Sequence, residues 1–566
     1  MKRPPLAPLA LHRVYQLPNW RRCIATVTIL CVPSAGCHRE KTTQQGAPRA
    51  KSSVVVVSTT HRPNRSPETS GSSNSGSANS AAPTSGAADS AEHPKTASDF
   101  SPSSFLSRQL PTEVPRLYAK TRHVWIYAEP DATKQWIGYL WTGGSVKLRD
   151  SKPKYGIGCE LFYAIEPRGY VCVDGGRATV DPKDPVVVST FPYSPRVNTP
   201  FLHRYGESRG APLYLNLPNE QEQRFREGDY LAQKSRIKSA LEGHSRHSLL
   251  ENVDLAAAPV GTMSFPKLSP SAHEAHGELK IRSTVAYSAE VRFAGRDFLL
   301  TSDYRFIPKD RVAVYPERYF EGLKLTKDVT LPLAWFRDAN CSAWQRNQDG
   351  SFAPMPELFP LHSYVQLTGK QERYQGKSYS ETRSGKWLEQ TCAVIPELAN
   401  KTPWDAQVGK PDNSPLRPKG RATWIEVSIK SGWLIAYEGT SPVFTTLISP
   451  GRGGAPTPGR PPLETSATPL GRFSITGKFA SSTMVAPHDY IHSEVPYAQN
   501  FSGPYALHTA YWHNNWGHLM SGGCINLSPI DALYLFQWTE PEAPDGWYGT
   551  RWLPYLEPAT TLLIRR

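Results

Sequence analysis

The C-terminal part of the chain carries the stretch Ala506-Leu-His508-Thr-Ala-Tyr-Trp-His513-Asn-Asn-Trp-Gly-His518-Leu-Met-Ser521-Gly-Gly-Cys524-Ile-Asn526-Leu-Ser-Pro529. A cysteine acts as a nucleophile only as the thiolate, so it needs a base or a cation close by. His508, in an apolar run that favours a strand, is the candidate base for Cys524. The two glycines before the cysteine let the backbone approach a substrate and turn successive N–H groups toward a developing oxyanion.

The order of these residues, His508 followed by Ser521-Gly-Gly-Cys524-Ile-Asn526, resembles the catalytic motif of L,D-transpeptidases of the YkuD type. A second segment, Thr468-Pro-Leu-Gly471-Arg-Phe473, is similar to a Thr-Pro-x-Gly-x-Phe landmark of the same family and precedes the first in the expected order. The resemblance covers residues 422–566. It implies a C-terminal β-sandwich with a few helices, in a chain that is multidomain and mostly β.

The resemblance also implies roles for individual residues. Cys524 is the nucleophile, and His508 is the general base and acid, oriented by the backbone carbonyl of Thr509. The N–H groups of Gly522, Gly523 and Cys524 form the oxyanion hole. The residues assigned to substrate binding are Ser521, Asn526, Trp512 and Tyr497. Ser521 could equally serve only to shape the turn.

Two positions depart from the family pattern. Many members carry His or Arg where this chain has Gly522, so a second polar contact near the nucleophile is missing. Asn526 stands where many members have arginine, although others have asparagine. Neither departure removes the cysteine–histidine pair.

His513 and His518 raise the question of a metal site with Cys524. Their spacing is not a standard zinc pattern, and the loop between them offers no carboxylate ligand. We therefore expect no metal and no cofactor, and we expect Trp512 and Trp516 to border the acyl-binding cleft. The facing wall or flap is expected from three residues upstream of His508: Tyr490, Pro496 and Tyr497.

The patterning of the final domain indicates a hairpin and a helix. Apolar residues alternate from Ile425 to Ile429, Ser431-Gly432 makes a turn, and Trp433-Leu-Ile-Ala-Tyr437 follows as the returning strand. After the nucleophile, Ser528 and Pro529 predict a helix N-terminus, with Asp531 at its third position beside the helix dipole.

Composition limits the classes of function. The chain has 566 residues and a formal net charge of +14, which indicates several domains. Its Lys and Arg residues are scattered, and no helix-turn-helix, RNP-like or zinc-finger pattern is present, so we expect no nucleic-acid partner. Excess positive charge suits work against an anionic surface such as a cell wall or lipid headgroups.

The N-terminus is typical of an export signal. Basic residues precede the apolar run 23–32, which is too short to span a bilayer, and Ser34-Ala-Gly-Cys37 follows it. This ending resembles a bacterial lipobox, with Ser34 where leucine is usual. We predict a lipoprotein-type signal over residues 1–37, lipidation at Cys37, and a location at the periplasmic face of a bacterial membrane.

Residues 38–115 are rich in Ser, Gly, Ala and Pro and predict a disordered linker, because few large apolar side chains offset the chain entropy. Residues 116–185 show short alternating runs and resemble a bacterial SH3-like domain. A β-rich middle region, 186–400, contains a helix between 201 and 236 and is a candidate second SH3-like module. Residues 401–421 are the expected linker to the catalytic domain.

The chain has eight cysteines, of which Cys23, Cys31 and Cys37 lie in the predicted signal. We expect a local disulfide between Cys159 and Cys172, and a second one between Cys341 and Cys392. Cys524 is then left over, and an odd thiol in an exported protein is a candidate for reactivity.

Together these features predict a monomeric enzyme that acts on peptidoglycan stem peptides. Cys524 would take the acyl group of a tetrapeptide stem and pass it to an amine, which forms a cross-link. If water accepts the acyl group, the same site is an L,D-carboxypeptidase. Two further hypotheses are compatible with the sequence: a non-catalytic wall-binding lipoprotein and a zinc hydrolase.

Overall fold

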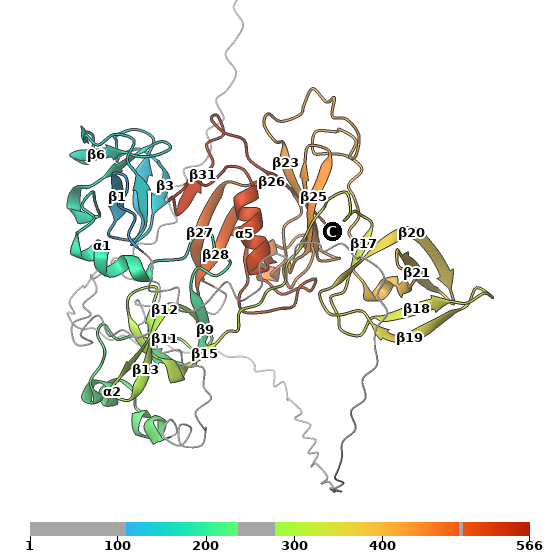
Figure 1. Cartoon of the computed structure of the whole chain (residues 1–566), viewed down its shortest axis with the longest axis horizontal. Coiled ribbons are helices and arrows are strands. Elements are labelled where there is room, and N and C mark those ends of the chain that lie inside the picture. The colour runs from blue at the N-terminus through green and yellow to red at the C-terminus, as the bar shows by residue number, and fades with distance from the viewer. Residues whose placement is uncertain (1–108, 236–277, 486–490) are drawn as a thin grey trace, which may run out of the picture. The chain divides into compact units, whose positions relative to one another are not determined.

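The computed structural model describes residues 109–235, 278–485 and 491–566 of the chain (Figure 1). The predicted signal, lipidation at Cys37, nearly all of the linker 38–115, and Tyr490 lie outside the described residues. The described part is mostly β with few helices, as the sequence predicted. None of its helices combines the length and the apolar character that a membrane crossing needs.

The first module of the described chain contributes to two sheets. A three-stranded sheet consists of β4 (Ser145–Lys147), β1 (Arg116–Ala119) and β8 (Ala178–Thr179). The other strands enter a larger sheet: β2 (Val124–Tyr127), β3 (Trp136–Leu140), β5 (Lys154–Tyr155), β6 (Leu161–Ala164) and β7 (Tyr170–Cys172). Alternation buries Val124 and Ile126 on one face of β2. A disulfide joins Cys159 to Cys172, and the SH3-like identity stays a prediction.

The sequence predicts one module in the middle region, whereas its described residues form two larger sheets and a separate two-stranded one. The first consists of β14 (Phe306–Pro308), β13 (Arg296–Thr301), β12 (Thr284–Phe293), β9 (Arg204–Ser208) and β15 (Val312–Val314). Its stretch of chain also forms α1 (Pro185–Thr190), α2 (Glu220–Arg226) and the pair β10 (Ala211–Pro212) and β11 (Glu278–Leu279). The helix predicted between 201 and 236 is α2, whose N-cap Asn219 accepts a hydrogen bond from Glu222 N–H.

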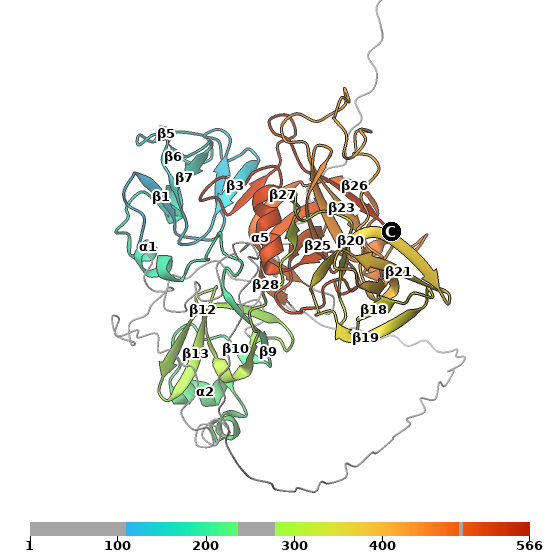
Figure 2. The ribbon, with the colours of Figure 1, turned by 45° about the vertical axis from the view of Figure 1, so that its right-hand side comes forward.

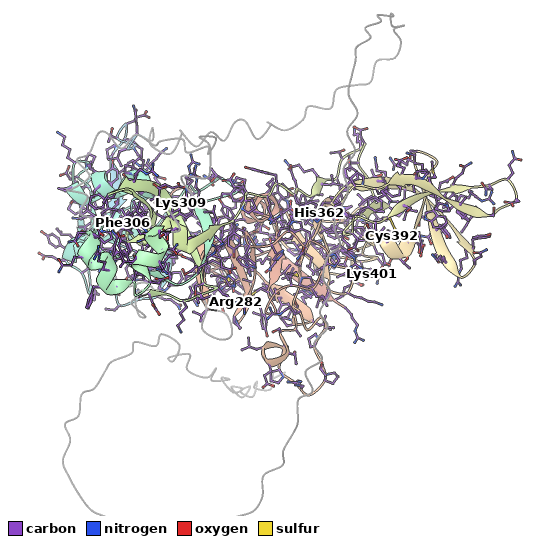
Figure 3. The ribbon with its side chains drawn as sticks, turned by 90° about the horizontal axis from the view of Figure 1, so that it is seen from below. Arg282, Phe306, Lys309, His362, Cys392 and Lys401 are labelled. Atoms are coloured by element: carbon purple, nitrogen blue, oxygen red, sulfur yellow. A yellow bond between two sulfur atoms is a disulfide. The ribbon has the colours of Figure 1, made fainter. Side chains whose placement is uncertain are left out.

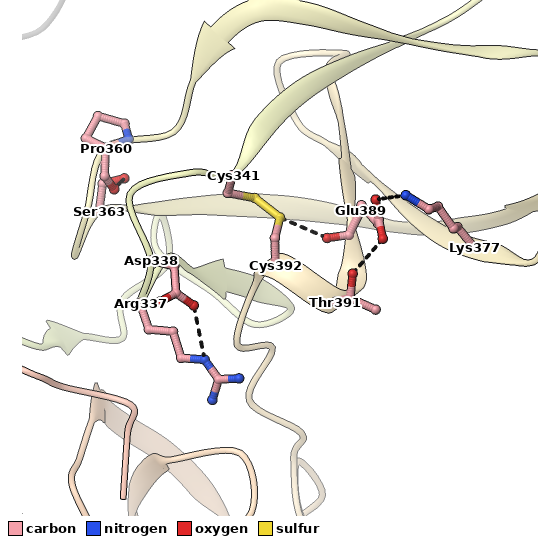
Figure 4. The surroundings of a disulfide bond; sticks show 9 residues. All are labelled: Arg337, Asp338, Cys341, Pro360, Ser363, Lys377, Glu389, Thr391 and Cys392. Carbon is pink, nitrogen blue, oxygen red and sulfur yellow. Dashed lines mark hydrogen bonds and ion pairs between the residues drawn. A yellow bond between two sulfur atoms is a disulfide. The ribbon is translucent and has the colours of Figure 1, made fainter. Parts of the chain in front are cut away.

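The second middle sheet has the order β17 (Leu333–Trp335), β20 (Tyr364–Tyr374), β21 (Lys377–Thr382), β22 (Trp387–Glu389), β18 (Ser342–Arg346) and β19 (Phe352–Leu358). A disulfide joins Cys341, just before β18, to Cys392, just after β22 (Figure 4). It borders a buried cluster that includes Phe336, Leu367 and Leu388. The disulfide therefore links the start of β18 to the segment after β22, beside this buried cluster.

The C-terminal region is built on two sheets around a shared apolar core. One has the order β16 (Leu323–Lys324), β25 (Ser441–Leu447), β24 (Trp433–Glu438), β23 (Thr423–Ser428), β32 (Thr561–Arg565) and β26 (Gly471–Ser474). The other begins with β30 (Ile525–Leu527), β29 (Tyr505–Thr509), β28 (Ile491–Ser502), β27 (Gly477–Val485) and β31 (Gly549–Arg551). The predicted hairpin is β23–β24, and its inward side chains Ile425, Val427 and Leu434 enter the core.

Two helices belong to this region: α4 (Pro462–Thr465) and α5 (Pro529–Trp538). As predicted, Ser528 caps α5 by accepting a hydrogen bond from Asp531 N–H at 3.1 Å. Helix α5 packs against β28 (Figure 2), where the ring of Phe536 lies 5.2 Å from that of Tyr497. The helix therefore covers the strand next to β29, which carries His508.

Sheet pairing crosses the domain boundaries expected from the sequence. Strand β3 of the first module pairs with β31, so its sheet continues into the C-terminal one. Strand β16 of the middle region pairs with β25. In the segment expected to be a linker, 401–421, Trp404 is buried and packs near Trp424. The C-terminal fold is thus completed by residues from outside it.

Candidate active site

Two parallel strands carry the candidate nucleophile and base. In the pairing of β29 with β30, His508 lies opposite Asn526. Cys524 is two positions before Asn526 and directly precedes β30. In a regular sheet, strands about 4.8 Å apart that rise about 3.3 Å per residue place such positions about 8 Å apart at Cα. An imidazole and a thiol can bridge that span, so the topology brings the sequence-distant pair together.

The His508 side chain is fixed in one tautomer. It is 4% exposed, and its Nδ1 lies 2.8 Å from the backbone carbonyl oxygen of Thr509. A carbonyl only accepts, so Nδ1 carries the proton and Nε2 is left as an acceptor. Burial lowers the pKa of His508 to about 4, and the Thr509 carbonyl opposes this shift. The imidazole is therefore neutral near pH 7, with its basic nitrogen free.

Cys524 is the one free cysteine of the described residues. Its Sγ is partly exposed and lies 3.8 Å from the Pro504 carbonyl oxygen. Burial raises the pKa of the thiol to about 11, while the Ala506 backbone acts in the opposite direction. Among the described residues no hydrogen bond joins Sγ to His508. The resting site therefore holds a protonated thiol beside a neutral base.

Ser521 organises the turn before the nucleophile. Its Oγ accepts a hydrogen bond from Gly523 N–H at 3.0 Å and donates to the Cys524 carbonyl oxygen at 2.6 Å. Gly523 N–H is therefore already used and does not serve the oxyanion hole in this state. In the described structure the N–H groups of Gly522 and Cys524 have no partner, so these two remain as candidate donors. Of its two predicted roles, Ser521 thus has the turn-shaping one.

The two glycines differ in what they allow. Gly523 has φ of 128°, and a Cβ there would lie 2.7 Å from the Tyr505 ring and 2.9 Å from the Ala467 carbonyl oxygen. Only glycine fits this position without rearrangement. Gly522 is exposed, and a Cβ there would meet nothing within 4 Å. The His or Arg that many family members carry at this position would therefore extend into open space.

The second landmark braces the same turn. Thr468 is fully buried, and its Oγ1 accepts a hydrogen bond from Gly451 N–H at 2.8 Å. Arg452 N–H in turn donates to the Ser521 carbonyl oxygen at 2.9 Å. The carbonyl of Ala467, the residue before Thr468, faces Gly523. The Thr-Pro-x-Gly-x-Phe segment thus holds the backbone behind the nucleophile.

Two of the side chains predicted to contact the substrate are buried in this structure. Asn526 is 1% exposed, and its side-chain amide lies 3.0 Å from His513 Nε2, so it supports the loop from within the core. Tyr497 is also 1% exposed; its ring packs on Phe536 and its hydroxyl donates to the Thr199 carbonyl. In this structure the polar groups of both side chains are engaged by other protein groups, His513 for Asn526 and the Thr199 carbonyl for Tyr497.

Aromatic rings surround the base. Trp512 is partly exposed, lies 6.0 Å from His508 between ring centroids, and stacks on His492 at 4.2 Å. The sequence does not point to His492, because it lies on β28, far along the chain from Trp512. Trp516, which we expected beside the cleft, is fully buried and donates to Asn514 Oδ1. It belongs to the core.

The histidines of the loop do not converge with Cys524. His513 is engaged by Asn526 and by Asn515 N–H, whereas His518 Nε2 lies 3.3 Å from the Arg337 carbonyl oxygen. In the described residues the only cluster with metal-ligand spacing is Cys159, Cys172 and Asp174, and its two sulfurs form a disulfide. The donor geometry thus favours a cysteine–histidine pair over a metal site.

Comparison with known families agrees with this geometry. Residues 422–550 match the family YkuD, described as the L,D-transpeptidase catalytic domain. The chain therefore contains an L,D-transpeptidase catalytic domain of the YkuD type. A comparison with curated proteins gave no match.

Solved structures of L,D-transpeptidases are also similar to this chain. The protein from Stackebrandtia nassauensis is 22% identical over 26% of this chain and 58% of its own, with a TM-score of 0.18. The one from Xylanimonas cellulosilytica is 20% identical over 26% and 63%, with a TM-score of 0.17. The catalytic domain from E. faecium is 21% identical over 26% and 100%, with a TM-score of 0.18. The chain thus spans about three fifths of the first two relatives.

Proposed function

We propose that this protein is an L,D-transpeptidase that remodels peptidoglycan by acyl transfer through Cys524. The observation that carries the proposal is the state of His508. Its Nδ1 is held by the Thr509 carbonyl and it is neutral, so Nε2 is directed to act as a base. The match of residues 422–550 to the YkuD catalytic domain supports the same assignment.

In the first step, the carbonyl between an L-centre and a D-residue of a tetrapeptide stem approaches Sγ. The low pKa of His508 and the high pKa of Cys524 make full proton transfer uphill before attack. We therefore propose that Nε2 takes the thiol proton as the S–C bond forms. The N–H groups of Gly522 and Cys524 stabilise the tetrahedral oxyanion.

In the second half of the reaction, His508 returns its proton to the leaving amine, and the terminal D-residue departs. The remaining acyl group is held as a thioester on Cys524. A side-chain amine of another stem then attacks, His508 accepts the amine proton, and the thiol is regenerated as an amide cross-link forms. When water attacks instead, the product is a free carboxylic acid and the reaction is an L,D-carboxypeptidation.

Export is part of the proposal. Two disulfides, Cys159–Cys172 and Cys341–Cys392, suit an oxidising compartment. A periplasmic location, attachment through Cys37 and a monomeric state rest on the sequence features given above. A thiol that remains unpaired in such a compartment is consistent with a nucleophile.

The decisive experiment is intact-mass spectrometry of the full chain after incubation with imipenem. One of the similar solved structures is an L,D-transpeptidase in complex with this compound. The wild type should gain one adduct, and Cys524→Ala should gain none. A wild-type chain that stays unmodified, although folded, would favour the non-catalytic wall-binding function.

A substrate assay then separates the two reactions of the same site. A tetrapeptide stem is supplied as donor, with and without a second stem that carries a free side-chain amine. Both reactions release the terminal D-residue; transpeptidation joins the remaining tripeptide to the second stem as a dimer, whereas carboxypeptidation leaves it as a free tripeptide. Loss of activity with a chelator, and not with Cys524→Ala, would instead support a zinc hydrolase.

A further inference from the structure

A cavity of about 340 Å³ lies beside the candidate site, between the sheet that contains β9 and β12 and the catalytic domain. Six of the fifteen residues that line it are Phe or Tyr, and they come from both sides: Phe201, Tyr205, Tyr287, Tyr315 and Tyr319 from the middle region, and Tyr511 from the catalytic domain. The volume is within the range of small-molecule sites, which bring apolar walls together with a few polar groups.

The junction that forms the cavity is firmly held. Tyr205 and Tyr511 stack with ring centroids 3.8 Å apart. The Tyr205 hydroxyl donates to the Glu494 carbonyl, and the Tyr511 hydroxyl donates to the Ser493 carbonyl at 2.7 Å. Their hydroxyls are therefore satisfied on the catalytic side, and the rings have a fixed position at the cavity.

The cavity is close to the general base. Tyr511 lines it, and the next residue, Trp512, lies 6.0 Å from His508 between ring centroids. The rings of Tyr511 and Trp512 are 4.9 Å apart and perpendicular. One layer of aromatic side chains thus separates the cavity from the imidazole, so a ligand held in the cavity would lie near the site, on the other side of this layer.

The charged groups of the lining balance one another. They are two arginines, Arg196 and Arg204, and two glutamates, Glu290 and Glu317. Arg204 lies 3.8 Å from Glu290, which also pairs with Lys309. Lys309 is labelled in Figure 3, near Phe306. An anion or a cation would meet charges of both signs here. A neutral ligand with many hydroxyl groups can instead donate to the carboxylates and accept from the guanidinium groups.

His203 supplies an independent sign of a ligand. It lines the cavity and is 2% exposed, yet in the described structure neither of its ring nitrogens has a hydrogen-bond partner. Burial lowers the pKa of His203 to about 3, so the ring is neutral and offers one donor and one acceptor. Buried polar atoms are seldom left unpaired, and a ligand hydroxyl can satisfy either nitrogen.

We propose that this cavity is a saccharide subsite, which holds a sugar unit of the glycan strand while its stem peptide occupies the Cys524 site. This inference rests on the proposed function for the identity of the polymer. The aromatic faces suit stacking on the C–H face of a pyranose ring, and the balanced polar groups suit its hydroxyls. Tyr319, 46% exposed, forms an open rim through which a chain can leave.

The test is calorimetric titration of the full chain carrying Cys524→Ser with tetra-N-acetylchitotetraose, a neutral oligomer of N-acetylglucosamine. We expect saturable binding, which Tyr319→Ala weakens roughly threefold to tenfold through loss of one stacking ring. Tyr555→Ala is the matched control, since Tyr555 is fully exposed elsewhere, and it should bind as the parent does. His203→Leu, which keeps a similar volume and removes both nitrogens, should also weaken binding.

No saturable binding of the oligosaccharide overturns the proposal, and so does equal affinity of the Tyr319→Ala and Tyr555→Ala chains. A free stem tetrapeptide is titrated in parallel; weakening of peptide binding alone by Tyr319→Ala would replace the saccharide with a peptide subsite. Because Cys524→Ser removes the thiol, these results are independent of acyl transfer. An imipenem adduct without sugar binding refutes the subsite alone, whereas sugar binding without an adduct refutes the enzyme.

Discussion

The acid–base behaviour of the site depends on two residues whose pKa values are shifted apart. Burial lowers the pKa of His508 to about 4 and raises that of Cys524 to about 11. Over the whole interval between these values the resting pair is neutral. A mechanism that needs the neutral imidazole should therefore be insensitive to pH until the imidazole becomes protonated.

This gives a prediction for the rate at which imipenem acylates Cys524. In the wild type the rate should be nearly constant around neutrality and fall below about pH 4, where protonation removes the base. In His508→Gln it should be much lower at pH 7 and rise about tenfold per pH unit toward the thiol pKa, because only the free thiolate reacts. Stopped-flow measurement from about pH 3 to about pH 9 checks both the fall in the wild type and the rise in the variant. A wild-type rate with the same slope as the variant would show that His508 is not the base.

The glycines before Cys524 give a matched pair of substitutions. Gly523→Ala forces a left-handed φ on a residue with a Cβ and drives that Cβ against Tyr505 and the Ala467 carbonyl. We expect a loss of roughly 2 kcal/mol in unfolding free energy and a loss of most imipenem acylation. Gly522→Ala places its Cβ in open space and should leave the unfolding free energy nearly unchanged. Denaturant unfolding of both variants tests this, and equal destabilisation would contradict the assigned roles of the two glycines.

At the scale of residues, the sequence could predict what local chemistry determines. The contact of the Thr509 carbonyl with His508 follows from motif order, and the turn contacts of Ser521 match one of the two roles that its position allows. The roles of Cys524 as nucleophile and of His508 as base rest on the same motif order and stay proposals. The burial of Asn526 and Tyr497 could not be predicted, because it depends on partners far along the chain, His513 and Phe536. A polar side chain near a nucleophile has the same sequence signal whether it faces substrate or the core.

Among the elements, α5 carries a buried carboxyl group that its sequence position does not explain. Asp531 stands in the first turn, where the helix dipole favours a charge, yet it is fully buried. Burial raises its pKa to about 7 from a usual 3.8, although hydrogen bonds from Thr446 and Gly322 oppose the shift. Its oxygens lie 2.5 Å from Thr446 Oγ1 and 2.7 Å from Gly322 N, so α5 is joined to β25 and to the segment before β16.

Linkage converts this shift into a prediction about stability. Between about pH 4 and about pH 7 the folded chain keeps a proton on Asp531 that the unfolded chain has lost, so its contribution to stability is present below pH 4 and is lost as pH rises through 7. Asp531→Asn resembles the protonated form, since its amide can donate to Thr446 Oγ1 while Thr446 donates to the Leu447 carbonyl. The free energy of unfolding of the variant should therefore increase relative to that of the wild type as the pH rises across this interval. Urea unfolding at several pH values measures the difference in unfolding free energy between the two proteins. If this difference did not change with pH, the raised pKa of Asp531 would be refuted.

Strong local patterns predicted elements well, and weak ones did not. The β23–β24 hairpin alternates apolar and polar residues around a glycine turn, and α5 has a capping serine and a proline. The short strands β16 and β26 have no comparable alternation, because each is ordered by pairing with a longer neighbour. The two middle sheets were merged into one module for the same reason, since their separation depends on which strands pair.

For the whole molecule, the relevant feature is a shared core on the far side of the β23–β24 hairpin. Trp424, Trp433 and Tyr437 are buried there against residues that precede the catalytic domain. Those residues are Phe320, Leu333, Trp335, Val394, Trp404 and Ala406. Residue 422 is therefore where the match to the family begins, but it is not a structural boundary, because one buried cluster contains residues from both sides of it.

Shortened chains test this view of the domain boundary. A chain of residues 422–566 would expose the three aromatic side chains of the hairpin, and each large apolar side chain contributes roughly 1.5–3 kcal/mol when it is buried. We expect such a chain to bind a hydrophobic dye, to aggregate on warming and to melt well below the longer protein. A chain of residues 315–566 retains the shared core and is the matched control. It should melt at a higher temperature than the shorter chain, because the side chains that cover this face of the hairpin are kept. If the two chains melted at the same temperature, the residues before 422 would not stabilise the catalytic domain, and the packing around Trp404 and Trp335 would contribute nothing to its unfolding free energy.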